Sequence, residues 1–382
     1  MQEISPLETM FMRCAVALLA IALIGIVLGD AFETIVLPRR VARRWRLARL
    51  FYRLTWTPWA AVARRIGPGA RRESFLGIYG PLSVLFLLAM WGTNLMLGFG
   101  VLHWSLGTTM NTPGGPPSLG TYLYLSGTTF FTLGLGDVTP RGPLARGLIV
   151  LESGLGFGFL ALVIGYFPVL YSAFSKREVP ITLLDLRAGS PPSVGELLRR
   201  HGRDHLHHLD QFLREWERWT AELMESHLSY PVLAYFRSQH ANQSWLGALT
   251  TILDACALRM AGARDGEDWQ AGATFAMVRH AVIDLARVFH LDPRTPSPDR
   301  LSSSDLARIF DLLSEAGQPP SDSKEMARRL SDLRRSYEPY VNALADRFLM
   351  PLPAWVHIGS HSVDRDAPPS VGSGKGAQSS SD

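Results

Sequence analysis

Cysteine and lysine are both scarce in this 382-residue chain, and glycine-rich nucleotide-binding sequences are missing. Cys14 and Cys256 are the only cysteines and have no CxxC spacing, so neither a disulfide framework nor a zinc finger is expected. Lysine occurs only at Lys176, Lys324 and Lys375, and arginine supplies the rest of the positive charge. No GxGxxG sequence follows a strand-like run, which argues against a nucleotide-binding regulatory domain.

Basic residues are absent from one long internal region, and this gap predicts how the chain is oriented in a membrane. Residues 73–140 contain no lysine or arginine, whereas residues 39–72 contain eleven arginines. Positive residues mark the cytoplasmic side of membrane helices. We therefore expect the N-terminus and the loop 103–145 to lie outside the cell. The arginine-rich block and everything after about residue 175 are expected to be cytoplasmic.

Three apolar stretches match the roughly 20 residues that a membrane-spanning helix needs. They are residues 14–36, 75–102 and 148–174. The first lacks a small-residue cleavage site and runs directly into LPRRVARR. We interpret it as a retained helix rather than a secretory signal.

The arginine-rich block allows three interpretations. Four arginines recur at every third position: Arg40, Arg43, Arg46 and Arg49. This spacing is typical of a voltage-sensing helix. However, only one apolar stretch precedes the block, and a voltage sensor needs further partner helices. An unstructured linker is the second possibility. The third, which we favour, is a basic amphipathic helix on an inner leaflet of anionic lipids, because Trp56 and Trp59 suit a membrane interface.

The sequence TTFFTLGLGDVTP, residues 128–140, follows a short helix that cannot cross a bilayer. Ser118 can cap this helix, which we predict over residues 119–131. The chain must therefore enter the membrane and return on the same side. Non-helical backbone at that depth is tolerated only where protein buries it or water lines it. Since the side chains of TLGLG are mostly apolar, the useful chemistry of this loop is its carbonyl groups.

Glycine at alternate positions gives those carbonyls a common direction. An ordinary strand points successive carbonyls to opposite sides, and aligning them requires left-handed conformations that glycine adopts freely. Gly134 and Gly136 would let the carbonyls of residues 132–135 face one axis, and the hydroxyl of Thr132 adds a further oxygen. Such a ladder replaces the hydration shell of a monovalent cation. The negative end of the preceding helix dipole also favours a cation.

These residues resemble the selectivity filter of potassium channels. The resemblance is carried by the six residues from Thr132 to Asp137: Thr132, Leu133, Gly134, Leu135, Gly136 and Asp137. It covers about residues 75–175, laid out like a two-transmembrane pore module. It implies K⁺ as the transported substrate, bound by Thr132, Leu133, Gly134 and Leu135, with no other cofactor. One such loop per chain implies a homotetramer around a central pore.

The loop departs from the family pattern at two positions. Leu135 stands where an aromatic residue is usual, and Phe131 stands where a second threonine is usual. A weakly selective monovalent cation channel is therefore one alternative, and a membrane-anchored sensor with a vestigial pore is another. A phosphate-binding loop at residues 134–139 is disfavoured, because the third glycine of GxGxxG and a preceding strand are missing.

The third apolar stretch holds the residues expected to move or brace the pore. Gly156 and Pro168 are candidate hinges, although small residues can also simply permit close helix packing. Glu152 is an acid within an apolar span, and we expect it to brace the filter, with snorkelling to the lipid interface as the alternative. Thr128 and Thr129 directly precede the loop and are expected to brace it as well.

The rest of the chain is predicted to be helical and soluble. After a short link at residues 175–180 and a strand-like run, VPITLLDL, helices are expected at about 193–223, 230–262, 266–290, 302–317 and 323–349. Three histidines share one helical face and allow a metal site, a pH sensor or plain solvation; they are His201, His205 and His208. The polar run YFRSQHANQSW at residues 235–245 is either a packing junction or a ligand pocket.

Together these features predict an all-α membrane protein with three transmembrane helices, a re-entrant pore helix and filter loop, and a cytoplasmic helical domain. The expected parts are an N-terminal transmembrane helix, a basic interfacial segment, a pore domain, the cytoplasmic domain and a disordered tail, at residues 1–37, 38–74, 75–175, 176–355 and 356–382. The expected location is a bacterial inner membrane. No nucleic-acid partner is expected and no enzymatic activity, and the sequence does not identify a cytoplasmic ligand or a gating stimulus.

Overall fold

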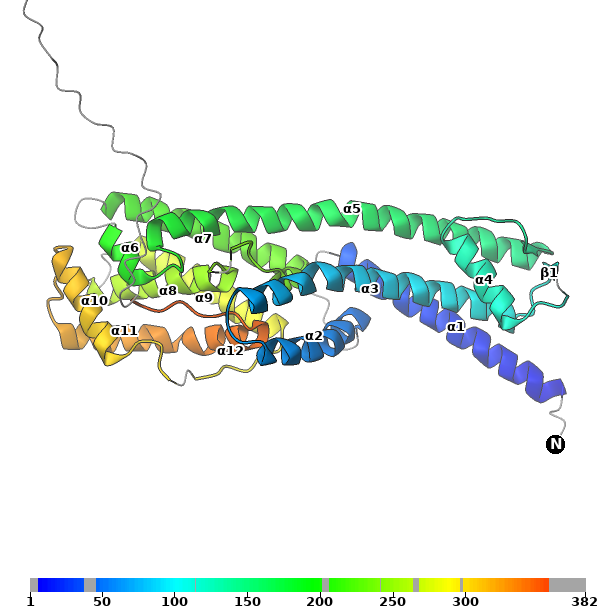
Figure 1. Ribbon diagram of the computed structural model, residues 1–382, viewed down its shortest axis with the longest axis horizontal. Coiled ribbons are helices and arrows are strands. Elements are labelled where there is room, and N and C mark those ends of the chain that lie inside the picture. The colour runs from blue at the N-terminus through cyan, green and yellow to red at the C-terminus, as the bar shows by residue number, and fades with distance from the viewer. Residues whose placement is uncertain are drawn as a thin grey trace, which may run out of the picture.

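A computed structural model describes residues 6–37, 46–113, 115–200, 206–240, 242–263, 268–295 and 298–356. The fold is almost entirely α-helical, as predicted, and it is elongated, with one very long helix, α5, running along it (Figure 1). Three helices are long and apolar enough to cross a membrane: α1 (Pro6–Ile35), α3 (Ala70–Ser105) and α5 (Pro143–Ala188). Each is longer than the apolar stretch that predicted it.

A short helix, α4 (Leu119–Phe130), lies between α3 and α5 at one end of the molecule (Figure 1). Ser118 caps it as predicted, because its hydroxyl accepts a hydrogen bond from the amide of Thr121, whose own side chain bonds back to the amide of Ser118. Two very short strands, β1 (Met110–Asn111) and β2 (Thr139–Pro140), pair antiparallel and close the loops on either side of α4.

Helix α5 corrects the expected link after the third apolar stretch. Neither a break at residues 175–180 nor a strand at VPITLLDL is present, since α5 continues unbroken through both. The reason is the periodicity of burial. Buried residues recur at spacings of three or four along the second half of the helix, at Arg177, Ile181, Leu184 and Ala188. Apolar residues at that period stabilise a helix against the elements that they face, despite their β-branched neighbours.

Helix α2 (Leu47–Arg65) packs on protein through one of the aromatic residues that were assigned to the membrane interface. Trp56 is buried, and its indole nitrogen donates to the carbonyl of Arg347 at 2.9 Å. The interfacial prediction is therefore wrong for Trp56. Arg46 precedes the helix and lies 3.7 Å from Glu33 of α1. Arg40 and Arg43 lie outside the described residues.

The C-terminal helices form a bundle at the other end of the molecule from α4 (Figure 1). Two of the predicted long helices, at 230–262 and 323–349, are wrong in extent, because each one is interrupted within the described residues. The observed elements are α6 (Val194–Arg200), α7 (Leu206–Ser229), the 3-10 helix η1 (Pro231–Tyr235), α8 (Trp245–Gly262), α9 (Trp269–Val288), α10 (Ser303–Glu315), α11 (Ser323–Arg335) and α12 (Glu338–Phe348). The predicted tail from residue 357 onward lies outside the described residues.

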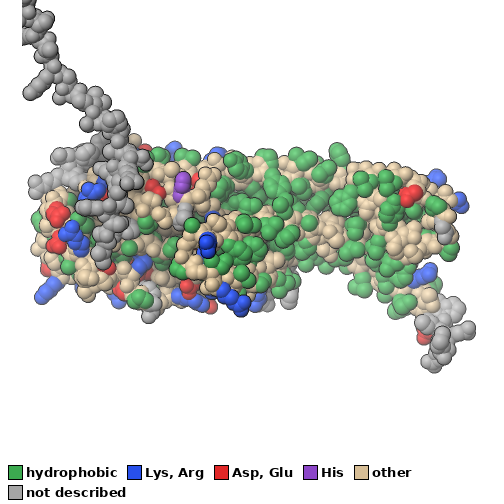
Figure 2. Space-filling view, viewed as in Figure 1, with side chains coloured by type: hydrophobic (Ala, Val, Ile, Leu, Met, Phe, Trp, Pro, Cys, Tyr) green, Lys and Arg blue, Asp and Glu red, His purple; other side chains and the backbone are tan. Residues whose placement is uncertain are grey.

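Two apolar cores run through the molecule. One joins α1, α3, α4 and the first half of α5, and the other joins the C-terminal helices with α2, the start of α3 and the end of α5. Figure 2 shows the same division on the surface, where apolar side chains cover the part built from the long helices and charged side chains gather over the C-terminal helices. The start of α3 and the end of α5 therefore extend into the C-terminal bundle.

Candidate functional site

The loop that follows α4 has an alternating backbone. Thr132, Gly134 and Gly136 have φ angles of 55°, 53° and 80°, in the left-handed region. The sequence predicted this conformation at the two glycines and missed it at Thr132. A β-branched residue is strained there by about 1–3 kcal/mol, and such strain persists only where the surroundings impose it.

Backbone hydrogen bonds from the loop to the end of α4 impose that conformation. The carbonyl of Thr128 accepts from the amides of Leu133 at 2.7 Å and Gly134 at 3.2 Å. The carbonyl of Thr129 accepts from the amide of Thr132 at 3.0 Å. Both threonines therefore contact the loop through their backbone carbonyls, and the hydroxyl of Thr128 donates to the carbonyl of Leu125 within α4 instead.

The far end of the loop is tied to α4 by a side chain that sequence reasoning missed. The hydroxyl of Tyr124 donates to Asp137 Oδ2 at 2.9 Å. The sequence offered one signal for this contact, because Tyr124 is a hydrogen-bonding residue in the aromatic and hydroxyl-rich run directly before the loop. The residues from 132 to 137 are therefore held at both ends by one short helix.

A single chain leaves this loop open. Every residue from 131 to 137 is exposed, and the side chains of Leu133 and Leu135 are 63% and 64% accessible. Non-helical backbone at membrane depth is tolerated where protein buries it or water lines it, and one chain does not bury this loop.

Gly156 of α5 lies against the last residue of α4. A Cβ at this position would be 2.1 Å from the carbonyl oxygen of Phe130, whereas one at Gly154 would meet nothing within 4 Å. Only glycine permits α5 to approach α4 this closely. The geometry therefore supports the interpretation that Gly156 permits close helix packing. Pro168 lies inside α5, which continues through it.

Glu152, one turn before Gly156, is fully buried between α3, α4 and α5. The hydroxyl of Ser126 on α4 lies within hydrogen-bond distance of both a carboxyl oxygen of Glu152 and the carbonyl of Met96 on α3, and its single hydrogen can be donated to one of them at a time. The other carboxylate oxygen lies 3.9 Å from Nε2 of His103. Snorkelling of Glu152 to a lipid interface is therefore excluded by its burial. Ser126 and His103 were missed, although each is a polar residue in an apolar helix.

A separate set of contacts joins α5 to the C-terminal helices. Arg177 is buried and donates to the carbonyls of Leu233 at 2.8 Å and Phe236 at 3.0 Å. One of its nitrogens lies 3.4 Å from Nε2 of His227, whose Nδ1 faces the carbonyl of Leu223 at 2.8 Å. Burial and the charge of Arg177 lower the pKa of His227 to about 3, so this histidine is neutral.

The polar run at residues 235–245 serves as a packing junction. Tyr235 stacks on Tyr52, and Arg237 is paired with Glu73 of α3 at 3.4 Å. Gln243 donates to Asp185 of α5 at 2.7 Å. A cavity of about 330 Å³ also lies between this run and α5. The alternative interpretation of the run as a ligand pocket is therefore still compatible with the structure.

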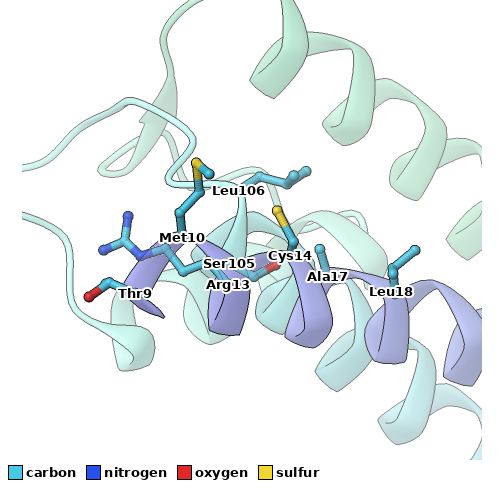
Figure 3. Close-up of a pocket in the computed structure, with 8 residues that line it drawn as sticks. All are labelled: Thr9, Met10, Arg13, Cys14, Ala17, Leu18, Ser105 and Leu106. Atoms are coloured by element: carbon cyan, nitrogen blue, oxygen red, sulfur yellow. The ribbon is translucent and has the colours of Figure 1, made fainter. Parts of the chain in front are cut away.

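Two other features lie apart from the loop. His201 and His205 are outside the described residues, as is the side chain of His208, and the described part of the chain holds no cluster of acids, histidines and cysteines suited to a metal ion. An open groove of about 880 Å³ separates α1 from the end of α3, with Arg13 at its polar end and Cys14 and Leu18 along its wall (Figure 3).

Comparison with known proteins places the loop within a recognised region. A protein-family model described as an ion channel matches residues 84–172. Protein LctB of Geobacillus stearothermophilus is 32% identical over 93 residues, which are 22% of this chain and 69% of that protein. The uncharacterized membrane protein YdjJ of Bacillus subtilis (strain 168) is 26% identical over 183 residues, which are 47% of this chain and 53% of YdjJ. The match therefore spans about half the length of YdjJ. No solved structure matches.

Proposed function

Because this chain belongs to the family of two-transmembrane pore-domain ion channels, we propose that it is a potassium channel whose filter is the loop from Thr132 to Asp137. Four copies surround one pore, and the carbonyls of Thr132, Leu133, Gly134 and Leu135 bind K⁺. The C-terminal helices lie in the cytoplasm of a bacterial cell and the N-terminus lies outside, as the arginine distribution favours.

The observation that carries this proposal is the alternation of left-handed residues at Thr132, Gly134 and Gly136. Alternation is the backbone state that lets successive carbonyls share one direction, which a filter for dehydrated cations requires. The exposure of the whole loop in one chain supports a pore completed by further copies. Glu152, Ser126 and the two threonines are bracing residues in this arrangement.

The decisive experiment is K⁺ flux through purified protein in lipid vesicles, comparing the parent chain with Gly134→Ala. A Cβ on left-handed backbone costs about 1 kcal/mol or more per subunit, so four subunits shift the filter away from its conducting conformation by roughly a thousandfold. Gly134 has open space around it in one chain, so the effect is conformational.

The matched control is Gly25→Ala, which adds the same methyl group to an uncrowded helical glycine of α1. Flux is expected to be nearly lost in Gly134→Ala and to persist in Gly25→Ala. Parent-like flux through Gly134→Ala removes the filter assignment, and absent flux in the parent chain favours a sensor with a vestigial pore.

A weakly selective cation channel remains the second candidate, because Leu135 and Phe131 stand where an aromatic residue and a threonine are usual. The reversal potential in opposed K⁺ and Na⁺ gradients separates the two candidates. A potential close to the K⁺ equilibrium value supports selectivity, whereas a value near zero supports the weakly selective channel.

A further inference from the structure

A cavity of about 410 Å³ lies in the C-terminal bundle, between α6, α7, α8 and the connection from α10 to α11. Two of its walls are apolar rows on single helix faces. Val194, Leu197 and Leu198 line it from α6, at spacings of three and four residues. Leu209 and Leu213 line it from α7, one turn apart. Apolar cavities of this size are typical of sites for small molecules.

Small residues keep the cavity wide on its other side. Ala255 of α8, Ala263 at the end of that helix and Ala316 after α10 all line it. Protein interiors are otherwise close-packed, with few voids larger than a water molecule. Longer side chains at these three positions would occupy the space. The exposed residues Gln318 and Pro319 also line the cavity, so it communicates with the surface.

A buried donor lies beside this apolar space. Arg259 of α8 is one of the lining residues, and its Nη1 is buried and has no hydrogen-bond partner among the described residues. The other two guanidinium nitrogens are engaged, because Nη2 lies 2.8 Å from Asp210 Oδ1 and Nε is paired with Asp268 Oδ2. A buried donor without a partner costs free energy, which an acceptor on a bound molecule would recover.

The charges around Arg259 favour an uncharged ligand. Asp210 and Asp268 place two negative charges against its one positive charge, so a further carboxylate would be repelled. Asp268 also lines the cavity, where it receives hydrogen bonds from Arg259 and from the amide of Ala271. A carboxylate has room for more than two such bonds. A head group that accepts from Arg259 and donates to Asp268 therefore matches this pair.

We propose that this cavity binds an uncharged amphiphile, with an aliphatic chain along the leucine walls and a hydroxyl or amide head group between Arg259 and Asp268. Burial of the chain supplies the affinity, and the two polar side chains fix its orientation. The site adjoins the end of α5, because α6 forms one of its walls and the amide of Ser193 donates to the carbonyl of Ala188 at 2.8 Å.

Photolabelling of the full-length protein in lipid nanodiscs tests this site. The probes are decanamide and decanoate with the same diazirine in the chain, so that they differ chiefly in the charge of the head group. Mass spectrometry reads labelling of the peptides that contain residues 255–263 and 313–320. Decanamide is expected to label them, and an excess of decanamide without the diazirine should suppress that labelling. Decanoate should label them roughly tenfold less at neutral pH.

A pair of variants distinguishes binding inside the cavity from adsorption to the surface. In Ala255→Leu the longer side chain takes the space of the aliphatic chain, so the suppressible labelling is expected to fall to background. Ala276→Leu, at an exposed position of α9, is the matched control and should be labelled like the parent. Thermal unfolding checks that both variants are folded, and the competition with unlabelled decanamide in the parent requires no variant.

Three results would overturn the proposal. Labelling of the parent that is absent, or that excess decanamide does not suppress, removes the site. Suppressible labelling that persists in folded Ala255→Leu places the probe outside the cavity. Labelling by decanoate as strong as that by decanamide rules out selection for an uncharged head group. Binding here does not depend on ion conduction, so each of these results leaves the proposed channel untouched.

Discussion

At the scale of single residues, two glycines in and beside the proposed filter loop serve different purposes. Gly134 is needed for its left-handed backbone and has open space around it, whereas Gly156 is needed for the close approach of α5 to the carbonyl of Phe130. One requirement concerns φ and the other concerns volume. The volume requirement can be tested by itself, because Gly154 lies two residues from Gly156 and has open space around it, so an alanine there is a control for an alanine at Gly156.

Gly156→Ala is expected to destabilise the pore region by about 1–3 kcal/mol per chain, since overpacking against backbone cannot be relieved by a rotamer change. Thermal unfolding of the detergent-solubilised protein measures this loss. Gly154→Ala, the neighbouring control, should unfold like the parent. An unchanged midpoint for Gly156→Ala would show that α4 and α5 do not pack at this point.

His227 predicts a pH dependence of stability. Its pKa in the folded chain is lowered from about 6.5 to about 3, so the folded state binds fewer protons than the unfolded state between these values. Stability therefore rises with pH in this window and is fully present above about pH 6.5. Acidification to pH 5 should cost about 2 kcal/mol through this residue.

Chemical denaturation at pH 5 and pH 7 measures this dependence. In His227→Gln the difference between the two pH values should shrink, although the variant is less stable at pH 7. His280→Gln, at an exposed histidine of α9, should retain the parent difference. A parent difference that survives in His227→Gln assigns the pH dependence to other groups.

At the scale of elements, α5 is one continuous helix that joins the region of the proposed filter to the C-terminal helices. A long flexible link would dissipate a displacement, whereas a continuous helix can transmit it. The contact that couples the helix to its bundle is the guanidinium of Arg177, which satisfies the carbonyls of Leu233 and Phe236 and lies 2.8 Å from Glu178. In the proposed channel, a motion of η1 or α7 would therefore be passed to α5 through this residue.

Arg177→Met should cost about 3 kcal/mol or more, because it leaves two buried carbonyls and one acid without their partner. It should also change the single-channel open probability, since the bundle then holds α5 less firmly. Lys176→Met removes the neighbouring charge from an exposed position and is the matched control. Equal open probabilities for both variants and the parent would show that gating does not pass through Arg177.

At the scale of the whole molecule, a single chain leaves the filter loop and one long face of α5 uncovered. In the proposed channel, four copies around one axis would cover both. Native mass spectrometry of the solubilised protein should give about four times the chain mass of 42.3 kDa. A monomer or a dimer under conditions that preserve K⁺ flux would contradict this assembly.

The sequence by itself determined the features that depend on neighbouring residues. The three apolar helices follow from run length, the start of α4 follows from Ser118, and the left-handed backbone at Gly134 and Gly136 follows from the absence of a side chain. Each of these depends on free energies set within a few residues, so local pattern was sufficient. The loop was therefore recognisable before its geometry was known.

Only the tertiary structure decided the features that depend on distant residues. VPITLLDL has strand-forming residues, but burial of Ile181 and Leu184 against the C-terminal bundle makes it helical. Trp56 is apolar enough for a lipid interface, yet a carbonyl nearly three hundred residues away in sequence binds its indole. Glu152 finds its partner 26 residues earlier, on α4. The conformation of VPITLLDL and the partners of Trp56 and Glu152 depend on which surfaces pack together in the folded chain. Composition and residue spacing do not specify this packing.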